Sequence, residues 1–143
     1  MPIVRSVSAV SVSTVVAIVL FMLIEGLGSI LYPFPEDFAG TFEEIARHVE
    51  TCPAWVLALL GGVGYGATMF ICTFIAAYIG HNRNPWHGYG MGGFLFVLVV
   101  CNLTQLPFPI WYWVLTFTAL PAAAYFGTKF GATNTPPQHT EPQ

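Results

Sequence analysis

The chain has 143 residues, of which 55% are apolar and only 8% carry a charged side chain, and its mean hydropathy is +0.67. Soluble domains average roughly 25% charged residues, so this composition argues against an ordinary water-soluble fold. The net charge is -3 and the chain has only four basic residues, a balance that predicts no nucleic-acid partner. We therefore expect an integral membrane protein that has the lipid bilayer as its main partner.

Stretches without a charged residue predict the membrane spans, and they cover residues 6–24, 51–82 and 84–128. A helix needs about 20 apolar residues to cross a hydrocarbon core about 30 Å thick, so the first two stretches hold one span each. The third is longer, and residues 104–109 interrupt it with two prolines and polar groups that suit a tight connection. The sequence thus predicts an all-α membrane protein with a four-transmembrane-helix bundle.

The expected transmembrane domain covers residues 1–132, with spans at about 7–31, 54–80, 88–105 and 109–130. The remaining residues, 133–143, are polar and rich in proline, and they predict a disordered tail.

The distribution of charge predicts how the bundle is oriented. Five of the seven acidic residues fall within 36–50, in the first loop, whereas Arg5, Arg83 and Lys129 flank the other ends of the spans. Basic residues are retained on the cytoplasmic side of a membrane. We therefore expect cytoplasmic N and C termini and an extracytoplasmic first loop, with Arg47 as the exception.

A short amphipathic helix is expected in this first loop. Thr41 and Glu44 have the spacing of a capping box, and apolar residues follow with helical periodicity at Phe42, Ile45 and Val49. Glu44, His48 and Cys52 recur at i, i+4 spacing, which in principle could present metal ligands. A solvated helix face is the favoured interpretation, and neither a metal nor a cofactor is predicted.

Glu25 lies near the outer end of the first span, where an ionisable side chain is unusual. A carboxylate at the centre of a bilayer costs on the order of 2.5 to 3.5 kcal/mol, and less toward the interface. In one interpretation it joins a polar pocket and holds the outer half of the bundle together; in the other it is a proton or cation site. The expected pocket comprises Glu25, Tyr32, Asn102, Thr104, Gln105 and Thr116.

Small residues predict where helices approach closely. Gly62 and Gly66 form a GxxxG pair in the second span, and Gly28 and Gly92 take similar places in the first and third. The sequence leaves open whether these glycines pack within the chain, in a homo-oligomer or against another membrane protein. His81 and His87 are expected to be solvated in the second loop.

Several of these features occur together in known proteins. An acidic residue late in the first span, the stretch Leu31-Tyr32-Pro33-Phe34-Pro35, and Asn102 before Pro107-Phe108-Pro109-Ile110-Trp111 resemble a family of uncharacterised small four-span bacterial inner-membrane proteins. The resemblance covers most of residues 18–127 and implies a location in the bacterial inner membrane, without an activity. The small multidrug resistance exporters also carry a glutamate in their first span. Here Glu25 is nearer the outer end, and the long acidic first loop has no counterpart in those exporters.

Three functions are compatible with the sequence. A non-catalytic structural or accessory component is favoured, because no nucleophile, metal cluster or cofactor motif is recognisable and no catalytic residue is predicted. A small proton- or cation-coupled transporter would use Glu25. A membrane enzyme acting on lipid at the outer interface would use Glu25 and His48 as acid and base.

Overall fold

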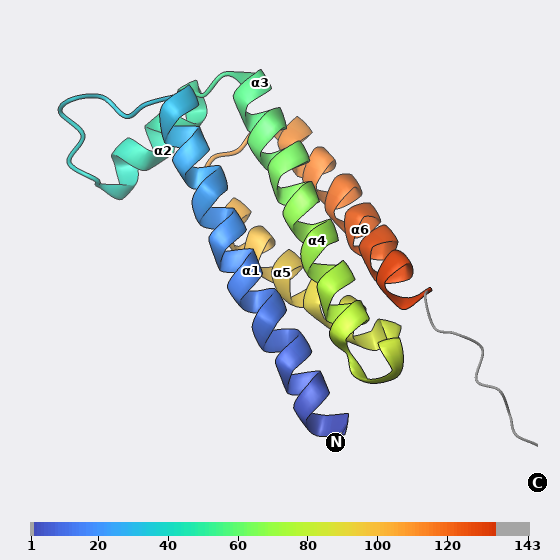
Figure 1. The fold of residues 1–143 in the computed structure, drawn as a ribbon. Coiled ribbons are helices and arrows are strands. Elements are labelled where there is room, and N and C mark those ends of the chain that lie inside the picture. The colour runs from blue at the N-terminus through green and yellow to red at the C-terminus, as the bar shows by residue number, and fades with distance from the viewer. Residues whose placement is uncertain (1, 134–143) are drawn as a thin grey trace, which may run out of the picture.

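The computed structural model describes residues 2–133, and this part of the chain is helical, without a strand. The elements are α1 (Pro2–Leu31), α2 (Phe42–Thr51), α3 (Ala54–Leu57), the π-helical η1 (Ala58–Gly64), α4 (Tyr65–Ile79), the 3-10-helical η2 (His81–Arg83), α5 (Pro85–Gln105) and α6 (Ile110–Ala132). α3, η1 and α4 follow one another directly and run as one long helix (Figure 1). The expected tail lies outside the described residues, except for Thr133.

Three stretches are long and apolar enough to cross a membrane, namely Val4–Leu31, Ala54–Ile79 and Pro85–Gln105. α6 has 23 residues, but its tryptophan, tyrosine and threonine side chains lower its hydropathy. Large apolar side chains cover the outside of the helices, and Met22 and Ile30 of α1 are 70% and 78% exposed. A water-soluble monomer rarely exposes apolar surface of this extent, so the molecule is a helical membrane protein with three candidate spans.

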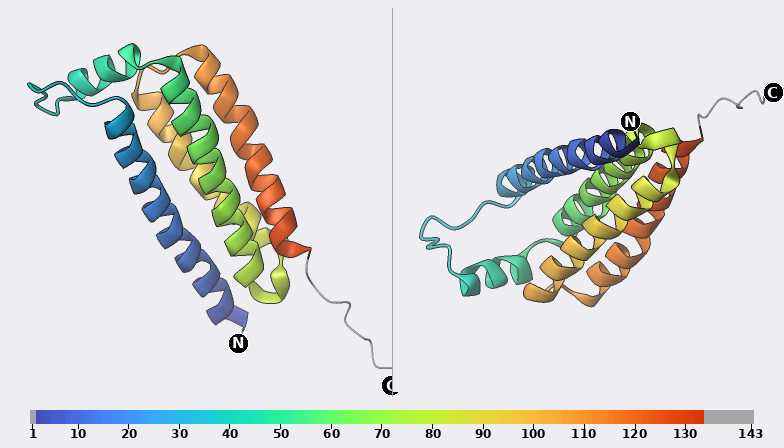
Figure 2. Two further views of the ribbon diagram at one scale, coloured as in Figure 1. Left: turned by 45° about the horizontal axis from the view of Figure 1, so that its top comes forward. Right: turned by 90° about the horizontal axis from the view of Figure 1, so that it is seen from below.

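α4 is the central helix of the bundle. It packs against α1, α5 and α6, whereas α1 meets α5 over a short length only. The N-terminal end of α1, η2 and the C-terminal end of α6 lie together, at what we name the η2 end (Figures 1 and 2). The opposite end is the α2 end, where α2 lies beyond the end of α1 and runs crosswise to the long helices (Figure 2).

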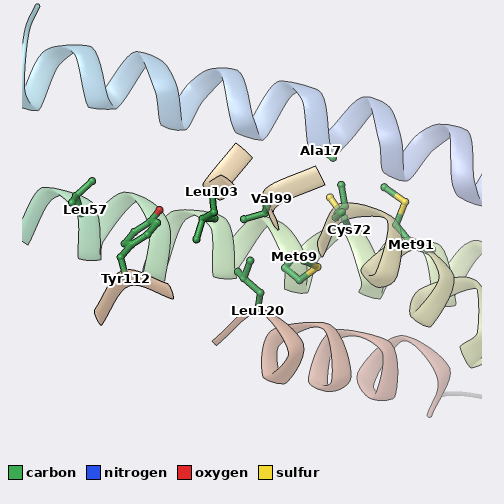
Figure 3. Close-up of a cluster of buried hydrophobic side chains, with 11 residues drawn as sticks. Ala17, Leu57, Met69, Cys72, Met91, Val99, Leu103, Tyr112 and Leu120 are labelled. Atoms are coloured by element: carbon green, nitrogen blue, oxygen red, sulfur yellow. The ribbon is translucent and has the colours of Figure 1, made fainter. Parts of the chain in front are cut away.

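A cluster of buried apolar side chains fills the space between the helices (Figure 3). α4 contributes Met69 and Cys72 to this cluster, and Leu120 of α6 is fully buried. α5 contributes Leu95, Val99 and Leu103, which recur at i, i+4 and i+8 on one face. This periodicity explains why α5 turns one face to α4 and leaves the other to the outside.

Close helix approach is concentrated toward the η2 end. A Cβ placed on Gly131 would lie 2.5 Å from the main-chain oxygen of Phe74, and one on Gly127 would collide with the main-chain oxygen of Phe70. On α5, a Cβ on Gly88 would lie 2.9 Å from the main-chain oxygen of Thr73. Main-chain atoms cannot rotate away, so only glycine fits at these three positions.

The helices that meet at the η2 end extend beyond the start of the expected spans. α1 begins at Pro2, before the expected start at residue 7, and α5 begins at Pro85, before residue 88. The Asn84 side chain accepts a hydrogen bond from the Trp86 main-chain N–H at 3.0 Å and caps α5. Asn82 and Arg83 have φ values of 54° and 48°, which reverse the chain tightly.

Candidate functional site

Glu25 meets a partner that the sequence did not indicate. The Tyr65 hydroxyl donates a hydrogen bond to Glu25 Oε1 at 2.9 Å, linking α1 to α4. Tyr65 is the first residue of α4, directly after the π-helical η1. Its ring also meets Phe21 of α1 edge to face, with centroids 5.2 Å apart. The carboxylate is therefore held by an α4 side chain and flanked by an aromatic pair.

A cavity of about 200 Å³ opens beside this pair at the α2 end, and we name it the end cavity. Its polar lining includes Glu25 of α1, Tyr32 directly after α1, His48 of α2, Tyr65 of α4 and Asn102 of α5. The rest of the wall is mainly aliphatic and aromatic. A concave, mostly apolar cavity with a few convergent polar groups has the composition of a small-molecule site.

A second cavity, of about 230 Å³, lies between α1, α4 and α5, and we name it the side cavity. Glu25, Tyr65 and Asn102 line it as well as the end cavity. Its apolar wall is formed by Phe21, Leu98 and Val99. The same three polar residues therefore face both the end of the bundle and its side.

An aromatic stack closes the α2 side of the end cavity. The His48 ring stacks on Tyr32 and on Phe34, with centroids 4.3 Å apart in both pairs, and Phe34 continues onto Phe38 at 4.2 Å. The Tyr32 hydroxyl also donates to Thr51 Oγ1 at 2.9 Å. These contacts hold α2 against the end of α1.

The capping box of α2 is present in full. Thr41 Oγ1 accepts from the Glu44 main-chain N–H at 3.3 Å, and Glu44 Oε2 accepts from the main-chain N–H groups of Thr41 and Ala39 at 3.1 and 3.0 Å. The hydrogen bond from the Thr41 main chain, helped by that from Ala39, holds the pKa of the Glu44 carboxyl below its ordinary value. Glu44 therefore fixes the start of α2, and it lies outside the end cavity.

Cys52 follows α2 and lines the end cavity. Burial raises the pKa of its thiol, because the surroundings disfavour the thiolate. The thiol therefore stays protonated at neutral pH. Within residues 2–133, no group of three or more His, Cys, Asp or Glu side chains could hold a metal ion.

The six residues of the expected polar pocket are not all brought together. Glu25, Tyr32 and Asn102 line the end cavity. The side chains of Thr104, Gln105 and Thr116 instead donate to main-chain oxygens of their own helices, at 2.8, 3.1 and 2.9 Å. Each thus satisfies its hydrogen-bonding need within three or four residues of itself.

Tyr65 and Tyr112 are the residues of the site that the sequence reasoning missed. Tyr112 of α6 is 4% exposed, and its phenol ring lies against Gly61 so closely that a Cβ there would collide with it. The glycines within residues 61–66 indicate a place where a large side chain of another helix can lie against the main chain, because glycine has no side chain in the way.

Of the four glycines expected at helix contacts, three have neighbours. A Cβ on Gly28 would lie 3.1 Å from Leu60, one on Gly62 3.2 Å from Leu115, and one on Gly92 3.0 Å from Ala124. A Cβ on Gly66 would meet nothing within 4 Å. The GxxxG pair thus has one member in contact and one in open space.

His87 lies in the first turn of α5 and is not on a solvated loop. Its Nε2 hydrogen bonds with the Ser6 hydroxyl at 2.9 Å, joining α5 to α1. Nδ1 of the same ring lies 3.3 Å from the main-chain oxygen of Asn84. A Cβ on Gly80 would lie 2.7 Å from this ring, so His87 is a packing residue of the η2 end.

Comparison of the chain with protein-family models, curated proteins and solved structures gave no match.

Proposed function

We propose that the protein is a non-catalytic, four-span membrane protein that binds a small cationic group at Glu25 in its end cavity. The observation that carries this proposal is the position of the Glu25 carboxylate, which joins Tyr65 and lines a cavity of about 200 Å³. No Lys or Arg is among the described residues that line this cavity. A carboxylate in such a setting attracts a positively charged ligand.

The proposed fourth span is α6, and the proposed location is the bacterial inner membrane with both termini in the cytoplasm. The length of α6, 23 residues, and its close packing on α4 support a span. Arg5, Arg83 and Lys129 belong to the η2 end, and the acidic loop belongs to the α2 end. The positive-inside rule then makes the end cavity extracytoplasmic, which reporter fusions after residue 38 and after residue 133 would test.

A binding role is favoured over passage across the membrane. Thr73 and Ala76 of α4 and Thr128 of α6 are 0% exposed toward the η2 end. These side chains lie among the helix contacts that bring main chains together. A ligand that reaches Glu25 from the end cavity therefore meets closely packed residues below it.

Titration calorimetry of the purified protein in lipid nanodiscs with butylammonium chloride tests this role. We expect saturable binding that weakens at least tenfold in Glu25→Gln, because the substitution removes the negative charge and keeps the shape. Glu36→Gln, a loop carboxylate outside both cavities, is the matched control and should bind like the parent protein. Equal binding by the parent protein and Glu25→Gln would overturn the proposal.

Two other functions use residues of the same cavity. A proton- or cation-coupled transporter would use Glu25, and a lipid-directed enzyme would use Glu25 with His48, which line the end cavity together. Proteoliposomes test both: flux that Glu25→Gln abolishes would favour the transporter, and lipid turnover lost in Glu25→Ala and His48→Ala would favour the enzyme. The proposed binding role predicts neither flux nor turnover.

A further inference from the structure

The side cavity gives the Glu25 site a second opening, between α1 and α5. Its lining consists of Phe21 and Glu25 from α1, Tyr65 from α4, and Leu98, Val99 and Asn102 from α5. α1 and α5 are both candidate membrane spans, and they meet over a short length only. An opening between two spans, flanked by apolar side chains, faces the lipid and not the water.

Hydrogen-bonding groups at this opening remain available. Tyr65 occupies Glu25 Oε1, and within residues 2–133 no side chain or main-chain group donates to Oε2. The Asn102 side chain likewise has no hydrogen bond to any described residue. Both side chains are exposed at this opening, so a ligand that supplies hydrogen-bond donors can reach them.

The ligand must also supply the positive charge. The described residues that line the side cavity include no Lys, Arg or His, so the Glu25 carboxylate has no counter-charge there. Arg47 lines a different cavity, beyond Tyr32 and His48. A primary ammonium group offers three N–H donors with one positive charge, enough for Glu25 Oε2 and the Asn102 amide oxygen together.

We propose that an amphiphile with a primary ammonium head enters from the lipid between α1 and α5. Its head would bind Glu25 and Asn102, and its alkyl chain would lie along Phe21, Leu98 and Val99. A trimethylammonium head lacks N–H donors and binds more weakly here. This inference rests on the proposed function, because it names the ligand class and the entry route for the same carboxylate.

Photolabelling in nanodiscs tests the route directly. The probe is a 16-carbon primary amine with a diazirine in mid-chain, and labelled positions are mapped by mass spectrometry. We expect labelling concentrated near Phe21 on α1 and near Leu98 and Val99 on α5. Dodecylamine should compete at least tenfold better than dodecyltrimethylammonium or dodecanol.

Two variants separate the head-group contact from the route. Glu25→Gln should reduce this labelling at least fivefold, and Glu36→Gln should not change it. Leu98→Trp should also reduce it, because a larger side chain narrows the opening; Leu98 is 48% exposed, so the substitution leaves the core intact. Its matched control is Val114→Trp on α6, which is 60% exposed and lies outside both cavities.

Even labelling of all exposed helix faces would overturn the lateral route, because it indicates simple partition into lipid. Labelling that all three competitors reduce equally would overturn the ammonium assignment. A disulfide formed between the Leu98→Cys side chains of two copies would also overturn the proposal, because this face would then be an interface between chains.

If butylammonium binds in a Glu25-dependent manner but the photolabel does not, the route fails and the proposed function stands. If neither binds, both fail.

Discussion

At the η2 end, glycines of α5 and α6 bring main chains against α4, whereas at the α2 end the helices are separated by the rings of Tyr65, Phe108 and Tyr112. The glycine contacts leave no room for an added methyl group. The rings leave cavities of about 200 and 230 Å³ beside them. Toward the η2 end a cavity of about 230 Å³ remains between α5 and α6, with a mainly apolar lining that includes Gly92 and Ala124. The bundle thus combines an end whose glycines hold α5 and α6 closely on α4 with an end whose cavities contain a carboxylate.

The difference follows from the size of the residues at each contact. Without a hydrophobic driving force between helices in lipid, close packing of small residues supplies much of the association free energy. At the α2 end larger side chains lie between the helices, and Glu25, Tyr65 and Asn102 line the cavities beside them. The closely packed end is then expected to hold the fold, so that the open end can expose a carboxylate.

The largest expected effect is at the closely packed end. Gly127→Ala places a methyl group against the Phe70 main-chain oxygen and should lower the free energy of unfolding by about 3 kcal/mol. Unfolding by SDS titration in mixed micelles measures this. Gly90→Ala is the matched control, because a Cβ there meets nothing within 4 Å. Equal losses in the two variants would remove the contrast between the ends.

Gly61→Ala should have a smaller effect at the open end. The added methyl group meets the outer part of the Tyr112 ring, which can rotate, so we expect a loss of about 2 kcal/mol in the free energy of unfolding. The displaced ring should also enter the end cavity and weaken butylammonium binding. Gly66→Ala, in the same long helix, should be neutral or slightly stabilising. A loss as large as that of Gly127→Ala would mean that both ends are equally rigid.

Tyr65→Phe removes the hydroxyl that holds Glu25 and leaves the ring in place. We expect a loss of about 1 kcal/mol in the free energy of unfolding, because one hydrogen bond to a carboxylate disappears. Tyr125→Phe is the control, since Tyr125 is 48% exposed and lies on α6 outside the site. Stability unchanged in Tyr65→Phe would show that the link between α1 and α4 does not need this bond.

The smallest expected effect is a local pH dependence of α2. The folded-state pKa of Glu44 lies below its ordinary value, so the capping box stabilises α2 above about pH 4.5 and is lost as the pH falls through the lower, folded value. Hydrogen exchange of the α2 amides, corrected for intrinsic rates, measures this. Glu44→Gln should flatten the dependence. Amides of α6 should not follow the same titration, and a parallel change there would indicate global acid unfolding.

Local signals in the sequence predicted the helices well. The capping box of α2 is present as predicted, because its residues lie within one turn and need no distant partner. The sequence also indicates where α5 starts, because Asn84 is a good N-cap residue and Pro85 suits the first helical position. This pattern predicts His87 in the first turn of a helix, where the structure has it, and not in the preceding loop.

The candidate site was harder to predict, because its partners depend on helix rotation. A helical wheel assumes 3.6 residues per turn, and the π-helical η1 breaks that period just before Tyr65. Thr104, Gln105 and Thr116 could have bonded across the bundle, but each reaches a main-chain oxygen of its own helix. Sequence alone does not distinguish these two uses of the same side chain.

The π-helical segment Ala58–Gly64 sets the direction in which Tyr65 and the rest of α4 point relative to α3. A π turn contains one residue more than an α turn, so η1 behaves like an insertion between two α-helical parts with different angular phases. If Ala58–Gly64 became regular α-helix without losing a residue, Tyr65 would turn by about 100° relative to α3. The hydroxyl would then leave Glu25, although every residue of the cavity lining would still be in the chain.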